Sequence, residues 1–193
     1  MNQIKSNEQY DKVISEAKKE FIEKNKKYGN SLDVYNANGI LSKIFIKLYR
    51  IKSIQDAGEY KVEGETIEKE FPGVVNYCLY GIIIAQQIAS GIRILYEKEL
   101  LFAEYDKAVT ITRSLFQKKN HDYGEAWRQL SVSYMTQECL SKYERTQKMY
   151  KDMKFKPEKQ AELQKEFIEV FSDICNYSIF CSIRISEGVD PMI

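Results

Sequence analysis

The sequence predicts an all-α helical bundle, and three observations support this fold class. Apolar residues recur at i, i+3, i+4 and i+7 over long segments, which is the pattern of amphipathic helices. Few stretches alternate polar and apolar residues with the period of a β-strand. The 193 residues include only three prolines and nine scattered glycines, so few positions interrupt a helix.

Six helices are expected, and the residues at their ends support the boundaries. Their approximate ranges are 7–28, 40–57, 64–92, 99–121, 132–152 and 158–187. Gly29 and Gly124 each follow a helix rich in lysine, which is typical of a C-terminal stop. Pro157 suits the first turn of the last helix, where a missing N–H group costs little.

Composition and charge exclude several classes of protein. The chain carries 29 basic and 28 acidic residues, a net charge of +1, and 44% hydrophobic residues, as a folded globular domain does. Direct binding to nucleic acid is not expected, because it needs a basic surplus. The most apolar stretch, residues 74–92, contains polar residues and glycines, and residues 1–20 are polar, so we expect neither a membrane span nor a signal peptide.

The four cysteines lack the spacing of a zinc site. They are Cys78, Cys139, Cys175 and Cys181. All of them lie in apolar helical sequence, where a reduced, buried thiol is expected. We therefore expect a cytoplasmic protein without disulfides or zinc.

Part of the sequence occurs twice. The segment YDKVISEAKKEFIEKNKKYG (10–29) matches YDKAVTITRSLFQKKNHDYG (105–124) at eight of twenty positions, with an offset of 95. Chance would give roughly one identity. The same offset pairs Lys47-x-x-Arg50 with Lys142-x-x-Arg145, and an offset of 100 pairs Asn76-Tyr77 with Asn176-Tyr177.

The repeat predicts a tandem duplication of a three-helix unit. The two units are residues 8–98 and 99–187, in a single domain. Each unit is too small to bury its own apolar faces, so we expect one shared core and packing about a pseudo-twofold axis. Such a chain can be a monomer with internal pseudo-dimer symmetry, or a homodimer.

An acidic row on the last expected helix is the first candidate for chemistry. Its members are Glu162, Glu166, Glu169, Asp173 and Asn176, and they fall within an arc of roughly 80°. The rest of this helix is largely apolar, so the carboxylates need a positive partner. That partner is either a divalent cation such as Mg²⁺ or Mn²⁺, or basic side chains of neighbouring helices.

The complementary charges lie on the second and fifth expected helices. Lys142 and Arg145 share one face, and Lys47 and Arg50 repeat the pair in the first copy. Lysine and arginine both hold phosphate oxygens, but such pairs also form structural ion pairs.

The corner after the fourth expected helix combines polar and aromatic residues. Asp122 and Tyr123 precede Gly124, and Trp127, the only tryptophan, follows it. Aromatic rings at such a corner stack on a nucleobase or anchor the turn to the core. The first copy differs at these positions: Lys27, Leu32, Thr66, Lys69 and Gly73 replace Asp122, Trp127, Glu166, Glu169 and Asp173. We therefore expect one site, with acids from the second copy and cations from one copy or both.

These motifs resemble the nucleotide modification associated domain family. The resemblance rests on KKNHDYGEAW, the KxxR helix and ExxExxxDxxNY, and covers about residues 8 to 185. Members of that family also contain two copies of such a unit. The family is similar to the MazG-like all-α nucleoside triphosphate pyrophosphatases, which bind Mg²⁺ through acidic helix motifs. Those enzymes split an NTP or dNTP into a monophosphate and pyrophosphate.

The resemblance implies roles for eleven residues. Metal ligands would be Glu166, Glu169 and Asp173; the catalytic set would be Lys142, Arg145 and Asp122; nucleotide contacts would come from Tyr123, Trp127, Asn176, Lys47 and Arg50. The family pattern has a threonine–aspartate pair opening the KxxR helix. Here Thr136-Gln137 and Leu41-Ser42 stand at those positions, so the aspartate is missing.

Three functions remain open from the sequence. The first is a Mg²⁺-dependent pyrophosphatase acting on free, including modified, nucleotides. The second is an inactive nucleotide-binding or sensor module linked to DNA modification or defence, which the missing aspartate favours. The third is a helical interaction protein, whose acidic row only pairs with the basic residues.

Overall fold

The computed structural model describes residues 2–29, 31–91 and 98–192. Its elements in chain order are α1 (Asn2–Tyr28), α2 (Ala37–Ala57), α3 (Ile67–Ser90), α4 (Lys98–Tyr123), the 3₁₀ helix η1 (Ala126–Gln129), α5 (Val132–Met153), the 3₁₀ helix η2 (Pro157–Lys159) and α6 (Gln160–Ser186). The described part of the chain contains no strand, so the all-α prediction is confirmed. The expected end of the third helix, at residue 92, lies outside the described residues.

Local sequence explains where the helices begin and end. Asn36 and Ser131 precede α2 and α5, and their side chains accept hydrogen bonds from the backbone N–H groups of Gly39 and Tyr134. Gly29 and Gly124 follow α1 and α4 with φ values of +67° and +58°, so both predicted stops are confirmed.

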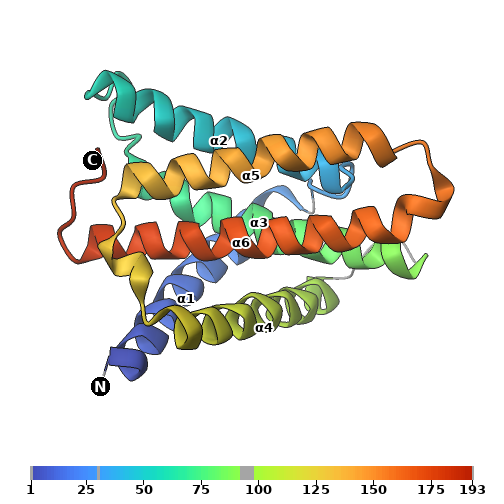
Figure 1. The fold of residues 1–193 in the computed structure, drawn as a ribbon, viewed down its shortest axis with the longest axis horizontal. Coiled ribbons are helices and arrows are strands. Elements are labelled where there is room, and N and C mark those ends of the chain that lie inside the picture. Colours follow the sequence, from blue (N-terminus) through green and yellow to red (C-terminus); the bar gives the residue numbers. More distant parts are fainter. Residues whose placement is uncertain (1, 30, 92–97, 193) are drawn as a thin grey trace.

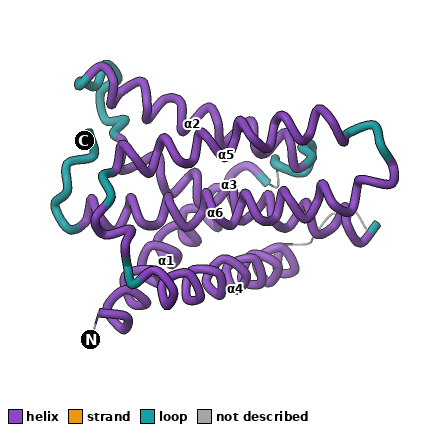
Figure 2. Tube along the Cα trace, in the orientation of Figure 1, coloured by secondary structure: helices purple, strands orange, loops and turns teal. Residues whose placement is uncertain are grey.

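The six helices lie in three layers (Figure 1). α3 and α6 form the middle layer and pack against each other more extensively than any other pair. α2 and α5 cover one side of this layer, and α1 and α4 cover the other. Each half of the chain thus contributes one helix to each layer, and the loops gather at the ends of the bundle (Figure 2).

Two asparagines in the middle layer make matching hydrogen bonds to the outer helices. The hydroxyl of Tyr10 donates to Asn176 Oδ1 (2.9 Å), and the hydroxyl of Tyr105 donates to Asn76 Oδ1 (2.7 Å). The amide nitrogens donate to main-chain carbonyl oxygens, Asn76 to Ala17 and Asn176 to Thr112. Tyr10 in the first half therefore bonds to the asparagine of the second half, and Tyr105 in the second half bonds to the asparagine of the first.

Ion pairs between α1 and α4 show the same correspondence. Arg113 donates two hydrogen bonds to Asp11, at 2.7 and 2.8 Å, and Lys18 donates to Asp106 at 2.6 Å. Arg113 and Lys18 occupy equivalent places, 95 residues apart, and so do the two aspartates. Matching positions thus make matching contacts across the interface of the two halves.

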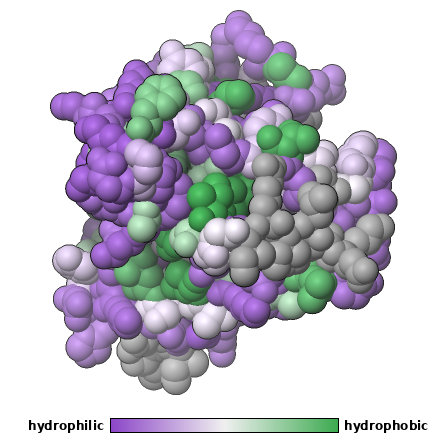
Figure 3. Space-filling view, turned by 90° about the vertical axis from the view of Figure 1, so that its right-hand side faces the viewer, coloured by the Kyte–Doolittle hydropathy of each residue, from purple (hydrophilic) through white to green (hydrophobic). Residues whose placement is uncertain are grey.

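A single cluster of buried apolar side chains fills the bundle and draws on both halves. The four cysteines belong to it, and burial raises the pKa of each thiol. α3 is long and apolar enough to cross a membrane, but 72% of its most apolar window is buried inside the bundle, as in a core helix. At the end of the bundle where α5 connects to α6, hydrophobic residues are visible amid a largely hydrophilic surface (Figure 3).

Candidate functional site

Two cavities lie at equivalent places in the two halves. The second-half cavity, between α4, η1 and α6, has a volume of about 280 Å³. Its lining comprises Phe116, Lys119, Asn120, Tyr123, Glu125, Ala126, Trp127, Leu130, Asp173, Asn176, Tyr177 and Phe180. The first-half cavity, between α1, α2 and α3, has a volume of about 130 Å³. Its lining comprises Phe21, Lys24, Asn25, Tyr28, Gly29, Ser31, Leu32, Lys47, Gly73, Asn76 and Tyr77.

The two cavities share most of their polar and aromatic groups. An offset of 95 relates Lys24, Asn25 and Tyr28 to Lys119, Asn120 and Tyr123, and an offset of 100 relates Asn76 and Tyr77 to Asn176 and Tyr177. The repeated residues at the ends of α1 and α4 therefore surround a cavity in both halves.

Charged groups close one end of the second-half cavity. Asp173 accepts hydrogen bonds from Lys119 (2.6 Å) and Lys142 (2.7 Å), and its side chain is 19% exposed. Burial alone would raise the pKa of Asp173, but the two lysines outweigh burial and hold this pKa below its usual value. Burial, Glu138 and Asp173 raise the pKa of Tyr177 to about 12, so its hydroxyl stays protonated.

The aromatic wall of this cavity is already packed. The Trp127 ring stacks on Phe180 at a centroid distance of 4.5 Å, and Arg128 Cζ lies 4.2 Å from the centroid of the same ring. The indole N–H donates to Asn120 Oδ1 at 2.9 Å. Both faces of Trp127 are therefore covered, and a nucleobase has no place to stack on them. Tyr123, which is 70% exposed, is the most accessible ring of the described lining.

A hydrogen-bond network holds Trp127 in place. Glu125 has a left-handed backbone conformation (φ 61°), which turns the chain into η1. Arg128 donates to Glu125 (2.9 Å), to Glu187 directly after α6 (2.8 Å) and to Ser6 of α1 (2.6 Å). Burial acts to raise the pKa of Glu125, but hydrogen bonds from Ser6 and Arg128 lower it. The network therefore connects η1 by hydrogen bonds to Ser6 and Glu187, which lie near the two ends of the chain.

The three predicted metal ligands do not converge. Glu169 is 60% exposed and lies 3.9 Å from Lys165, and Glu166 is about 10 Å from Asp173 along the helix. Each Asp173 oxygen accepts a hydrogen bond from an ammonium group, so a cation at Asp173 would meet two positive charges. Among the described residues, no group of three or more His, Cys, Asp or Glu side chains could hold a metal ion. The donor set in this arrangement therefore does not fit Mg²⁺ or Mn²⁺.

The remaining predicted residues are dispersed. Arg145 is exposed and lines neither cavity, and Asp122 is 70% exposed with His121 Nδ1 at 3.0 Å. Asn176 lines the second-half cavity, but its amide already bonds to Tyr10 and to a backbone carbonyl. Lys47 and Arg50 lie in the first half, where both pair with Glu70. The cations of the first copy therefore do not reach the second-half cavity.

Sequence reasoning missed Lys119, Asn120, Glu125 and Phe180. A signal for the first two was present, because Lys119 and Asn120 are among the eight identities between the copies. Glu125 has no acidic counterpart in the first copy, and only the path of the chain into η1 brings it to the cavity. Phe180 lies on α6 opposite Tyr80 of the first copy, and its contact with Trp127 depends on η1.

Both cavities lie largely within segments that match a known protein family. The model of the family described as nucleotide modification associated domain 1 matches residues 24–84 and 119–185. The chain belongs to this family. In each half, the matched segment of the nucleotide modification associated domain spans the end of the first helix and most of the third, which together carry the cavity residues. No curated protein and no solved structure matches the chain.

Proposed function

We propose that this protein binds a nucleotide in the second-half cavity. The observation that carries the proposal is a cavity with aromatic walls whose lining ends at Lys119 and Asp173. Asp173 also accepts a hydrogen bond from Lys142, which lies next to this lining. A nucleotide has the same division into a flat aromatic part and an anionic part. The family description, which refers to nucleotide modification, supports this ligand class.

The base would contact Tyr123. This side chain lines the cavity and is largely exposed, whereas the Trp127 ring is enclosed between Phe180 and Arg128. Stacking of a base on an aromatic ring contributes about 1–3 kcal/mol. The cavity of about 280 Å³ lies just below the usual volume range of small-molecule sites, and accommodates a base more readily than a whole triphosphate. The phosphates would then extend along the exposed side of Lys119.

The phosphates would contact Lys119 and Lys142. Each ammonium group has three N–H donors, and Asp173 accepts one hydrogen bond from each. The three side chains carry one net positive charge, so an anionic group that reaches the remaining donors compensates it. These contacts need no metal ion.

Hydrolysis of a nucleoside triphosphate is the activity that the MazG-like resemblance implies, and it requires a metal ion. Because the carboxylates do not converge and the opening aspartate of the KxxR helix is replaced by Gln137, we propose binding without hydrolysis. The protein would then be a nucleotide-binding module linked to DNA modification or defence.

Calorimetric titration with each of the four dNTPs, in EDTA, tests the proposal. We expect Lys119→Ala to weaken binding about tenfold or more, because it removes a charge-assisted contact. Lys118→Ala is the matched control, since this neighbouring lysine is exposed on the same helix and does not line the cavity.

Two outcomes would overturn the proposal. One is the absence of dNTP binding by the wild type. The other is release of pyrophosphate from a dNTP in Mg²⁺ that is lost in Asp173→Asn, which would show an enzyme with a rearranged acidic site.

A further inference from the structure

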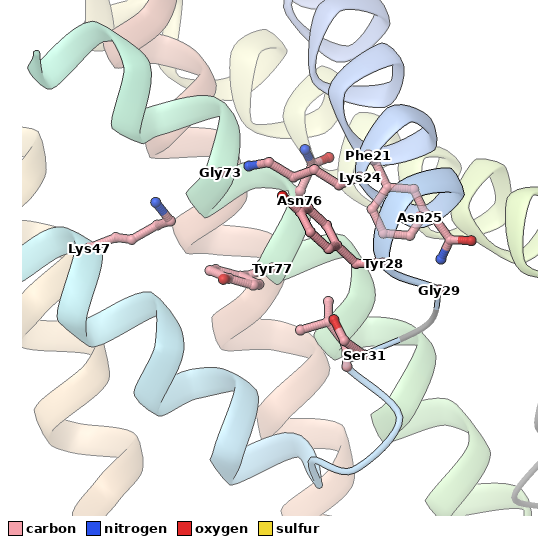
Figure 4. A pocket seen from close by; sticks show the side chains of 11 residues that line it. Phe21, Lys24, Asn25, Tyr28, Gly29, Ser31, Lys47, Gly73, Asn76 and Tyr77 are labelled. Atoms are coloured by element: carbon pink, nitrogen blue, oxygen red, sulfur yellow. The ribbon is translucent and has the colours of Figure 1, made fainter. Parts of the chain in front are cut away.

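The first-half cavity keeps the basic and aromatic groups of its counterpart without the acid. Lys24 extends from α1 and Lys47 from α2 toward the segment of α3 that carries Gly73, and the rings of Tyr28 and Tyr77 lie beside them (Figure 4). Gly73 stands where the second half has Asp173. The carboxylates that pair with these lysines, Glu20 and Glu70, are not part of the described cavity lining.

The absence of a side chain at Gly73 gives Lys47 its place. A Cβ atom at this position would lie 2.9 Å from Lys47 Cε and 3.1 Å from its Nζ. The ammonium group thus lies beside the helix surface that Asp173 occupies in the other half. In the second half, the carboxylate of Asp173 lies between Lys119 and Lys142. An anion that enters the first-half cavity meets no carboxylate at the equivalent position, Gly73.

A buried acceptor in this cavity has no partner. Asn25 is 5% exposed, and its Oδ1 atom accepts no hydrogen bond from any residue that the structure describes. The equivalent Asn120 accepts from the indole of Trp127, but the first half has Leu32, which offers no donor. An unsatisfied buried carbonyl is costly, so a ligand that brings an O–H or N–H donor gains from this position.

The mouth of the cavity retains an accessible ring. Tyr28 is 63% exposed, close to the exposure of its counterpart Tyr123. A ring this exposed contributes little to the core, so packing does not explain why both halves have tyrosine here. Tyr28 therefore offers an exposed ring for contact with a ligand at the mouth of the cavity.

We propose that the first-half cavity is a second binding site, specific for a small phosphate monoester with a hydroxyl donor. The phosphate binds Lys24 and Lys47, a hydroxyl donates to Asn25 Oδ1, and Tyr28 covers the ligand. The volume of about 130 Å³ limits the enclosed part to one ring, since a cavity of roughly 150 Å³ holds benzene. The chemistry fits a sugar phosphate, either free or as part of a nucleotide.

A charge substitution at Gly73 tests this site. Titration with ribose 5-phosphate compares wild type, Gly73→Asp and Gly73→Asn, two replacements of equal size. We expect the aspartate variant to bind about tenfold or more weakly than the asparagine variant, because the new carboxylate repels the phosphate and pairs with the lysines. Binding of dNTP to the second-half cavity stays unchanged in both, which shows that the fold is intact.

A second variant tests the hydroxyl contact. Asn25→Leu should weaken ribose 5-phosphate but not inorganic phosphate, which lacks the sugar. Competition with 2′-deoxyadenosine 5′-monophosphate shows whether the ligand is a nucleotide or a free sugar phosphate. Displacement of ribose 5-phosphate by this nucleotide indicates a nucleotide site, and no displacement indicates a site for a free sugar phosphate.

Three outcomes overturn the inference: no binding of ribose 5-phosphate to the wild type, equal binding by the two Gly73 variants, or loss of this binding in Lys119→Ala. The last would place the ligand in the second-half cavity. The proposed nucleotide site fails separately, through dNTP titration.

Discussion

The two cavities share one lysine, two asparagine and two tyrosine positions, yet they differ in charge and size. Two of the exchanges between them change charge and shape most: Asp173 stands opposite Gly73, and Trp127 opposite Leu32. Although tryptophan is larger than leucine, the second-half cavity is the larger one, because η1 places Trp127 against Phe180 as a wall. The residues that both halves retain therefore surround both cavities, and the exchanges at Gly73/Asp173 and Leu32/Trp127 change which ligand each cavity can bind.

The acidic partner also occupies different places in the two halves. In the first half, Glu70 lies one turn before Gly73 and pairs with Lys47 and Arg50, both from α2. In the second half, Val170 takes the place of Glu70, and the acid is Asp173. In each half one largely buried carboxylate pairs with two cations, but only the second half places that carboxylate in the cavity.

The largest expected effect concerns the contact between α3 and α6, where the two halves pack against each other. A Cβ atom on Gly81 would lie 2.6 Å from the ring of Phe171, which is fully buried. We expect Gly81→Ala to lower the free energy of unfolding by about 2–3 kcal/mol, because the ring has no free space to enter. Urea denaturation followed by circular dichroism measures the change.

Gly73→Ala is the matched control for this change. Gly73 lies on the same helix, but its added Cβ would meet only the flexible end of Lys47. Alanine is the better helix former, so the free energy of unfolding should stay the same or rise by up to about 1 kcal/mol. Equal effects of the two variants would show that the close approach at Gly81 does not limit the packing of α3 on α6.

The next effect concerns the aspartate that only the second-half cavity contains. Asp173→Asn leaves Lys142 without a carboxylate at a site where both side chains are about 80% buried, so we expect a loss of about 2 kcal/mol near pH 7. Asp122→Asn is the control, because Asp122 is exposed and lies outside the cavity. Thermal unfolding compares the two variants with the wild type.

The pH dependence of this loss tests its electrostatic origin. The pKa of Asp173 is lower in the folded than in the unfolded chain, so the unfolded chain takes up the proton first as the pH falls. The contribution of Asp173 is therefore complete above about pH 4, the ordinary aspartate value, and is lost as the pH falls through the lowered folded pKa. A constant difference between wild type and Asp173→Asn down to pH 2 would contradict this origin.

The fold was largely predictable because its signals are local. Apolar periodicity gave the helices, Gly29 and Gly124 gave two of their ends, and the repeat pointed to two similar halves. The short helix η1 was not predicted, because it depends on the left-handed conformation of Glu125 and on hydrogen bonds from Arg128 to residues far along the chain.

The site was less predictable, because spacing on one helix does not show what a neighbouring helix brings. The residues of the acidic row were expected to lie together at one site, because their spacing places them on one face of the helix. In the structure, Asp173 is enclosed by two lysines while Glu169 faces solvent. Lys119, four residues before Tyr123, was overlooked because the repeat was used to find the halves, not to select the residues that both halves retain.

The smallest expected effect comes from giving the first half the tryptophan of the second. In Leu32→Trp, the indole N–H can donate to Asn25 Oδ1 and the ring can pack on Tyr80, which stands where Phe180 lies in the other half. We expect the free energy of unfolding to rise by about 1 kcal/mol, the net contribution of one buried hydrogen bond. Leu32→Phe, which adds a ring without the donor, separates the hydrogen bond from packing. If the NMR spectrum shows a hydrogen-bonded indole proton and ribose 5-phosphate binds more weakly, the exchange between Trp127 and Leu32 accounts for the difference between the two cavities at this position. If the indole proton is exposed to solvent, the tryptophan also needs η1 to hold it in place.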